Sequence, residues 1–490
     1  MTRFRPNLDP ESSVPLYRQL GLYLRQLMES GDLHRGDRLP PTRELAAKLG
    51  LNRTTVSAAY EVLENEGLIK GEVGRGSYVS AMPSAKTQAL NWSRALTPSI
   101  SAGAGNPANG VINFTSSRPS EKLFPVDEFR ESCREVLDSP NLQTLMQLGS
   151  PGGYEPLRRY LLENAVQAGI ARESDDILVT NGCQQALDLL CRALVRTADK
   201  VAVEEPVYPG LKNLFLEAGA QLIGVDTDSE GLDLYSLQRA LDAGVKVLVV
   251  TPSFQNPTGA TISAATRAEV CRMARSAGVA VIENDIYSEL IYSPGAAGHA
   301  FPRLKELDAN VILLGSFSKI AFPGLRVGWI IAPRPVIARA MELKQLADLH
   351  TDHLSQAFLL RFAESGRLAR HQRAVIAAAK EKLRALEQSC RRFLTTCDYK
   401  VPAGGMNMWV NLPGGLDAVA LRGLAQQAGV DYLPGRYFSI SRPLDSGLRL
   451  SFAGLEPNEI RKGIEILGGV IRSAIDPRGN RDTQPALALV

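Results

Sequence analysis

The stretch GSFSKIAFPGLRVGW, residues 315–329, follows directly on a four-residue apolar run. A short apolar run that ends at a glycine is typical of a strand buried on both faces of a sheet. After the glycine, Lys319 stands seven residues before Arg326. Two hydroxyl side chains, Ser316 and Ser318, lie beside the lysine. Because open α/β sheets bind ligands at the carboxyl ends of their strands, we expect this stretch to form part of a ligand site.

Four further apolar runs precede this one and resemble it. The five runs are residues 177–179, 201–203, 247–250, 279–282 and 311–314. Helical stretches lie between several of them, which predicts an α/β fold with a buried, mostly parallel sheet. Each run is followed by polar or aromatic residues, so the ligand site is expected to draw on several strand ends.

These strand ends suit an aldehyde ligand that carries a phosphate. Lys319 can form a Schiff base (aldimine) with the aldehyde, and the helix start after Gly182 offers free N–H groups to the phosphate. Tyr208 is expected to stack on the ligand ring, and Asn256 and Tyr287 to bind its hydroxyl group. A carboxylate near the ring nitrogen would keep that nitrogen protonated. The candidate cofactor residues are Lys319, Gly182, Cys183, Gln184, Tyr208, Asn256, Asn284, Asp285, Tyr287, Ser316, Ser318 and Arg326.

An arginine, Arg449, lies in the alternating run GLRLSF at residues 447–452. Alternation of this kind predicts a half-buried strand. A buried arginine needs an anion, which is either a carboxylate of the protein or that of a bound ligand. A ligand carboxylate would be bound by both arms of the guanidinium group.

The segment from about residue 112 to residue 467 resembles the fold-type I aminotransferases. The resemblance rests on NPTG (256–259), SFSKIAFPGLRVGW (316–329) and GLRLSFAG (447–454). It implies pyridoxal 5'-phosphate as cofactor, a small C-terminal α+β subdomain, Lys319 as the aldimine lysine and Arg449 as the clamp for an α-carboxylate. Where that family usually has an aspartate, three residues before Tyr287, this sequence has Asn284 with Asp285 beside it. Leu148 stands where the family usually has a tyrosine that reaches the neighbouring subunit.

Residues 15–80 have a different pattern. Apolar residues at helical spacing predict helices near residues 16–30, 42–49 and 53–66, and a hairpin follows across residues 68–79. Three helices with a short turn before the third, followed by a hairpin, predict a winged helix-turn-helix. The alternative is a small helical domain whose polar residues are merely solvated, since residues 1–80 carry a net charge of only +1.

The stretch LPPTRELAAKLGLNRTTVSAAYEVLENEGLIKGEVGRGSYV, residues 39–79, resembles the GntR-type DNA-binding domain. In such domains the start of the third helix enters the major groove. The residues expected to contact DNA are Arg43, Asn52, Arg53, Thr54, Thr55 and Arg75.

The amino-acid composition excludes several other classes of protein. The chain has 490 residues, 44% of them hydrophobic and 22% charged, with a net charge of +3, which excludes a disordered or collagen-like protein. No apolar run is long enough to span a membrane, and neither a signal peptide nor a metal site is expected. Six separated cysteines predict reduced thiols and a cytoplasmic protein. Residues 81–110 are predicted to be a flexible linker between domains 12–80 and 111–473, and residues 474–490 a frayed tail.

A GntR-type domain joined by a long linker to an aminotransferase-like domain resembles the MocR subfamily of GntR regulators. The resemblance implies a pyridoxal-phosphate-dependent transcription regulator that binds an operator in double-stranded DNA, is a homodimer and senses an amine, amino acid or vitamin B6 effector. Two alternatives stay open: an active aminotransferase that carries a fused winged helix, and a DNA-binding protein whose large domain serves only dimerisation.

Overall fold

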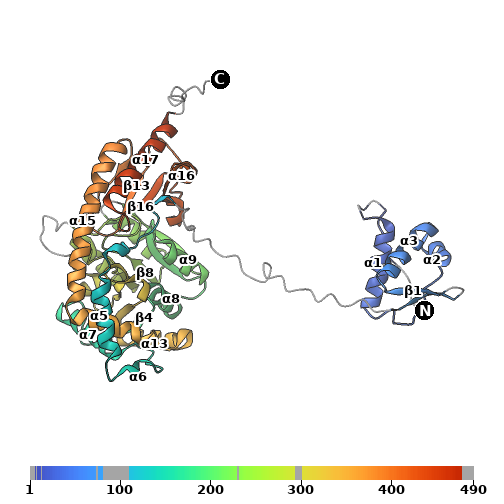
Figure 1. The fold of residues 1–490 in the computed structure, drawn as a ribbon, viewed down its shortest axis with the longest axis horizontal. Coiled ribbons are helices and arrows are strands. Elements are labelled where there is room, and N and C mark those ends of the chain that lie inside the picture. The colour runs from blue at the N-terminus through green and yellow to red at the C-terminus, as the bar shows by residue number, and fades with distance from the viewer. Residues whose placement is uncertain are drawn as a thin grey trace. The chain divides into compact units, whose positions relative to one another are not determined.

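The computed structural model describes residues 6, 8–10, 12, 14–72, 75–80, 110–228, 231–292 and 301–476 (Figure 1). The chain divides after Ser99 into two units, and each is described by itself. The predicted linker, apart from Gly110, lies outside the described residues, and so does most of the predicted tail. In the described part of the chain, no helix is long and apolar enough to cross a membrane.

The first unit is a three-helix domain with a two-stranded hairpin. Its elements are α1 (Leu16–Glu29), α2 (Thr42–Leu49), α3 (Arg53–Asn65), β1 (Ile69–Glu72) and β2 (Gly76–Val79). The strands are antiparallel, with Ile69 opposite Val79. Leu24 of α1 and Val56 of α3 are fully buried in one core, and Gly50 ends α2 in the left-handed conformation. The predicted winged helix-turn-helix is confirmed.

The second unit contains an eight-stranded sheet. Its strands, in spatial order, are β4 (Asp175–Thr180), β11 (Gly328–Pro333), β10 (Ile312–Ser316), β9 (Ala280–Asn284), β8 (Val247–Val250), β5 (Lys200–Glu205), β6 (Gln221–Asp228) and β7 (Gly231–Leu232). All neighbours between β10 and β6 pair in parallel, whereas β11 runs antiparallel to both β4 and β10. The five predicted runs all form strands of this mostly parallel sheet.

Helices cover both faces of this sheet, which explains why its strands are apolar throughout. Val247 and Val249 pack with residues of α8, α9 and α13, whereas Leu248 and Val250 pack with residues of α10 and α11. The bounds of the helices in the second unit are η1 Glu121–Leu123, α5 Val126–Leu137, α6 Leu142–Leu145, α7 Glu155–Gln167, α8 Cys183–Leu194, α9 Pro209–Glu217, α10 Leu234–Asp242, α11 Ala264–Ser276, α12 Leu304–Leu307, η2 Phe317–Lys319, η3 Pro323–Leu325, α13 Arg334–Asp348, α14 His353–Glu364, α15 Arg367–Phe393, α16 Ala418–Gln427, η4 Gly435–Phe438 and α17 Pro457–Ile475.

A smaller α+β part follows the large sheet in sequence. Its four-stranded sheet has the order β12 (Asp398–Tyr399), β13 (Asn407–Asn411), β16 (Gly447–Ser451) and β15 (Leu433–Pro434). Figure 1 shows α15 running along one side of the unit, with α16 and α17 beside β13 and β16. The start of the unit joins this part, because β3 (Ile112–Asn113) pairs in parallel with β14 (Val430–Asp431). Residues 115–117, next after β3, come close to the end of β10, because the Ser117 carbonyl oxygen accepts a hydrogen bond from Lys319.

Candidate functional site

A cavity of about 430 Å³ lies at the carboxyl ends of the parallel strands, between the large sheet and β16. Its walls include nearly all the residues singled out from the sequence: Cys183, Gln184, Tyr208, Asn256, Asn284, Tyr287, Ser316, Ser318, Lys319, Arg326 and Arg449. Gly182 and Asp285 do not line it. The lining residues that sequence reasoning missed are Thr115, Ser116, Ser117, Leu187, Pro209, Gly210, Thr251, Ile286 and Leu433.

One end of the cavity is suited to a phosphate group. Gly182 precedes α8 with a φ of 77°, and a Cβ there would lie 2.4 Å from Nη2 of Arg326, so only glycine lets the guanidinium group approach. Arg326 also donates to the carbonyl oxygen of Asn181 at 3.2 Å. Ser316 donates to the hydroxyl of Ser318 at 2.9 Å. A cation, a helix N-terminus and two hydroxyl groups therefore converge on one place.

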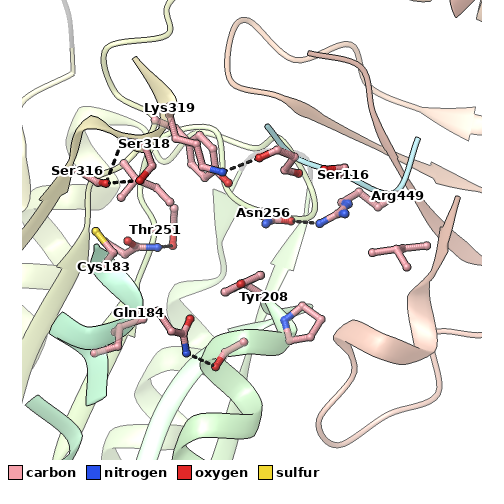
Figure 2. A pocket seen from close by; sticks show the side chains of 18 of the residues that line it. Ser116, Cys183, Gln184, Tyr208, Thr251, Asn256, Ser316, Ser318, Lys319 and Arg449 are labelled. Atoms are coloured by element: carbon pink, nitrogen blue, oxygen red, sulfur yellow. Dashed lines mark hydrogen bonds between the residues drawn. The ribbon is translucent and has the colours of Figure 1, made fainter. Parts of the chain in front are cut away.

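Lys319 reaches the cavity from the turn after β10 (Figure 2). Its Nζ donates to the carbonyl oxygen of Ser117 at 2.5 Å and lies 5.7 Å from the centre of the Tyr287 ring. Burial, reinforced by the positive charge of Arg449, lowers the pKa of Lys319 to about 8. A lysine with such a pKa is partly uncharged near neutral pH, which is the form that attacks an aldehyde.

Arg449 enters from β16, in the smaller part of the unit (Figure 2). It is 3% exposed, donates to Oδ1 of Asn256 at 2.9 Å and donates to the carbonyl oxygen of Thr115. Its Nε is buried with no hydrogen-bond partner. Among the residues that the structure describes, no carboxylate pairs with Arg449, and a buried arginine is costly without an anion.

Two aromatic side chains complete the walls. Tyr208 is 40% exposed and lies at the N-terminus of α9. Tyr287 is almost fully buried, and burial raises the pKa of its phenol to about 12, so the phenol stays protonated and can donate.

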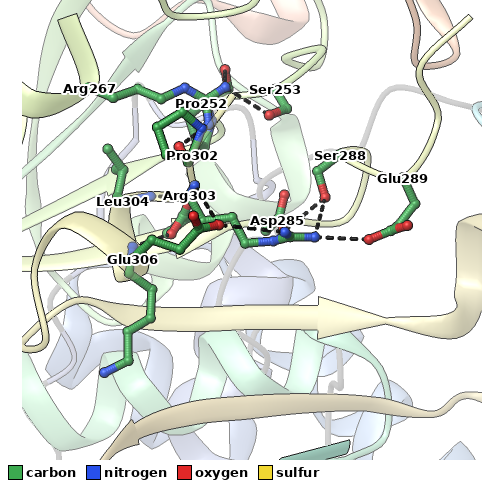
Figure 3. A network of polar contacts seen from close by, with 12 residues as sticks. Pro252, Ser253, Arg267, Asp285, Ser288, Glu289, Pro302, Arg303, Leu304 and Glu306 are labelled. Atoms are coloured by element: carbon green, nitrogen blue, oxygen red, sulfur yellow. Dashed lines mark hydrogen bonds and ion pairs between the residues drawn. The ribbon is translucent and has the colours of Figure 1, made fainter. Parts of the chain in front are cut away.

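The two candidates for the ring-nitrogen position behave differently. Asn284 ends β9 and lines the cavity. Asp285 lies outside the lining, where its Oδ2 accepts from Nε of Arg303 at 2.5 Å and from Oγ of Ser288 at 2.9 Å (Figure 3). The sequence could not choose between them, because Arg303 lies eighteen residues further along the chain.

The first unit presents the predicted DNA contacts at the starts of α2 and α3 and on the hairpin. Arg43, Arg53 and Thr54 are exposed, and Thr55 is half-buried. The Asn52 side chain accepts from the N–H of Thr54 at 3.2 Å and so caps α3.

Two arginines lie at the hairpin, one on it and one beside it. Arg75 has a side chain that is 79% exposed and lies 3.8 Å from a carboxylate oxygen of Glu72. Arg38, which sequence reasoning did not select, lies against the hairpin, because a Cβ on Gly76 would be 3.1 Å from its Nε. The hairpin and the start of α3 together offer guanidinium, hydroxyl and amide groups, the donors used at DNA backbones and base edges.

Comparison with known proteins accounts for both units. Residues 109–467 match the family model of aminotransferase class I and II, and residues 16–79 match that of the bacterial regulatory proteins of the gntR family. The probable rhizopine catabolism regulatory protein MocR of Rhizobium meliloti is 30% identical over 476 residues, which cover 94% of this chain and 94% of that protein.

Two similar proteins, an enzyme and a crystal structure, match about three quarters of this chain. The 2-aminoadipate transaminase of Thermus thermophilus is 33% identical over 371 residues, 75% of this chain and 91% of that protein. The crystal structure of LysN, an α-aminoadipate aminotransferase from Thermus thermophilus complexed with N-(5'-phosphopyridoxyl)-L-leucine, matches with a TM-score of 0.71 and 32% identity, over 79% of this chain and 99% of that chain.

Proposed function

This chain belongs to the MocR group of GntR-type transcription regulators, and we propose that it senses an amine, an amino acid or a form of vitamin B6 through Lys319. Its cofactor is pyridoxal phosphate, as in the aminotransferase class I and II family. When bound, the cofactor supplies an aldehyde carbon that can be joined to a primary amine. The chain's own residues decide which amine enters and what happens to it.

The cavity has groups that suit this cofactor. The Gly182–Arg326 contact and the two serine hydroxyls fit its phosphate, and the buried Oδ1 of Asn284 has no partner within the described chain. In the proposal, Lys319 holds the aldehyde, Tyr208 covers the ring, and Asn256 and Tyr287 hold the ring hydroxyl. Cys183 and Gln184 lie in the first turn of α8 and also contribute to the phosphate site.

The proposal rests above all on Arg449, a buried cation that lines the same cavity as Lys319 and has no carboxylate partner in the described chain. A ligand with both an amine and a carboxylate satisfies both residues at once. Arginine binds a carboxylate through two parallel hydrogen bonds, so the site favours an α-amino acid over a simple amine.

The first unit supplies the DNA-binding half of the function. We propose that Arg53 and Arg43 contact the operator, that Arg75 contacts a phosphate or the minor groove, and that a homodimer binds two half-sites. Because the target is chromosomal DNA in a bacterial family, we propose that the protein acts in the cytoplasm.

One experiment separates a regulator from a fused transaminase. The full-length protein, loaded with pyridoxal phosphate, is used to select binding sequences from a random DNA pool, and their affinity is then measured with and without each of the twenty amino acids. We expect a paired site whose affinity changes with one amino acid in the wild type but not in Lys319→Ala. Selection of no sequence, or rapid turnover of an amino acid without any change in DNA affinity, would favour the transaminase.

A further inference from the structure

Asn284 places an amide whose oxygen has no hydrogen-bond partner in the wall of the cavity. The residue is 7% exposed, and its Nδ2 lies 3.2 Å from Oγ1 of Thr251, to which it donates. Its Oδ1 is buried without a hydrogen-bond partner. The Thr251 hydroxyl can donate or accept, so its hydrogen bond with Asn284 is kept if the side-chain amide rotates by half a turn and exchanges its oxygen and nitrogen. Asn284 can therefore offer the cavity either an acceptor or a donor.

The neighbouring carboxylate, that of Asp285, is paired with an arginine outside the cavity lining. Asp285 pairs with Arg303 at 2.5 Å, and Arg303 in turn contacts Glu289 at 2.9 Å (Figure 3). The second oxygen of Asp285 is buried and unpartnered, but the residue does not line the cavity. Asn284, the last residue of β9, lines the cavity, whereas Asp285 follows the strand and does not, so Asn284 is the one of the two that faces a ligand.

Two further buried carboxyl groups lie near this wall, and neither reaches the cavity. Glu204 accepts from the N–H of Thr251 at 3.0 Å, and burial raises the pKa of Glu204 to about 8. Glu283 accepts from the N–H groups that begin α12, and burial together with Asp285 raises the pKa of Glu283 to about 7. Within the described residues, the wall that carries Asn284 therefore presents no carboxylate to a ligand.

We propose that Asn284 meets the ring nitrogen of pyridoxal phosphate and leaves it unprotonated, so that the site binds amines without promoting loss of their Cα proton. The proposal rests on the proposed function, since it needs the cofactor to be bound. A carboxylate beside the ring nitrogen would favour a proton there, whereas an amide has no charge with which to do so. A protonated ring is what accepts the electron pair left when a Cα–H bond breaks.

The consequence is a site that keeps its ligand chemically intact. The amino acid is held through its nitrogen at the Lys319 end and its carboxylate at Arg449, and its Cα–H bond is retained. Asn284 is thus the residue that makes the site bind an amino acid without converting it, in a cavity that otherwise has the groups of a transaminase.

The test uses full-length protein loaded with pyridoxal phosphate that is labelled with ¹⁵N in its ring. The ¹⁵N chemical shift reports ring protonation directly, between pH 6 and 8.5. We expect the wild-type signal at the unprotonated position and the Asn284→Asp signal at the protonated position. Glu204→Gln, which removes a nearby buried carboxyl group without changing its shape, is the matched control and should leave the wild-type signal in place.

A second readout follows the ligand rather than the cofactor. After incubation with one equivalent of the responsive amino acid, mass spectrometry should find it intact with the wild type, and more than tenfold more 2-oxo acid with Asn284→Asp. A protonated ring in the wild type, or a signal that moves in Asp285→Asn but not in Asn284→Asp, overturns the proposal. If Asn284→Asp does not fold, the wild-type signal alone decides. A protein that retains no labelled cofactor contradicts the proposed function instead.

Discussion

Nζ of Lys319 donates a hydrogen bond to the carbonyl oxygen of Ser117 at 2.5 Å, although the two residues are 202 positions apart. Arg449 makes the corresponding contact with the carbonyl oxygen of Thr115. The lysine proposed to hold the cofactor and the arginine proposed to hold the effector carboxylate therefore both donate to residues 115–117. In the chain, these residues come soon after residues 81–109, which join the DNA-binding unit to the cofactor-binding unit.

An effector whose carboxylate binds Arg449 competes with this segment for the guanidinium group, so the anchor of the segment should influence effector affinity. The Ser117 hydroxyl contacts Asn407 and lies 2.8 Å from Oγ of Ser451. Ser117→Ala removes these bonds and should tighten effector binding about fivefold, since one hydrogen bond contributes roughly 1 kcal/mol. Titration followed by cofactor absorption measures this affinity. Ser116→Ala, in the same segment, is the control, and weaker binding in Ser117→Ala would contradict the idea.

Cofactor attachment can be separated from cofactor affinity. Lys319→Ala should abolish the visible absorption of lysine-bound pyridoxal phosphate, while non-covalent binding and the melting temperature stay largely unchanged. Arg326→Ala should instead weaken non-covalent binding about 10- to 100-fold, because a charge-assisted hydrogen bond contributes roughly 1.5–3 kcal/mol. Equilibrium dialysis and absorption spectra distinguish the two. A wild-type protein that stays colourless with added cofactor would refute both assignments.

The rate of cofactor attachment should depend on pH. Because the pKa of Lys319 is lowered to about 8, the fraction of the lysine in its reactive neutral form increases as the pH rises through that value. The rate of attachment should increase with this fraction and become constant at higher pH. Arg449→Gln removes a positive charge that lowers this pKa, so the midpoint should move to higher pH. Stopped-flow absorption after mixing with pyridoxal phosphate gives the profile. Arg436→Gln, on the surface, should leave the midpoint unchanged, and an unmoved midpoint in Arg449→Gln would exclude the electrostatic cause.

The strands of the large sheet were predictable because both of their faces are buried. Runs such as residues 247–250 are apolar without alternation, and short runs of this kind bounded by turn residues favour strands. The direction of β11 was not predictable, since its residues 328–333 are as apolar as those of the parallel strands and only its neighbours β4 and β10 fix its orientation.

The site was predictable wherever polar residues follow a strand directly. Thr251, next after Val250, fits that rule and could have been found by it. Residues 115–117 could not, because β3 has only two residues and its place depends on β14, more than 300 residues later. Asn52 was selected for DNA contact, and the structure shows that it also caps α3, a role that asparagine favours at a helix start.

DNA recognition can be tested at the same helix. Arg53→Ala should weaken operator binding by about 1–3 kcal/mol and relax specificity at one position if Arg53 reads a base. If it meets only phosphate, the loss should be uniform across sequences and the salt slope should fall by about one unit. Fluorescence anisotropy at several salt concentrations separates these outcomes. Arg18→Ala, on α1, is the control, and unchanged binding by the Arg43→Ala, Arg53→Ala double variant at physiological salt would refute the assignment.

Effector recognition should depend on the shape of the Arg449 side chain as well as on its charge. Arg449→Lys keeps a positive charge near Lys319, so cofactor attachment and DNA binding should persist. Lysine lacks the planar pair of donors that binds both oxygens of a carboxylate, and truncating one charge-assisted bond should weaken amino acid binding about 10- to 100-fold. The variant is titrated with pyridoxal phosphate and then with candidate amino acids, and the cofactor spectrum and DNA affinity are followed together. A full response to the amino acid in Arg449→Lys would mean that the effector is recognised without its carboxylate, as a simple amine or the vitamin aldehyde would be. A response to decarboxylated analogues that equals the response to amino acids in the wild type would lead to the same conclusion by an independent route.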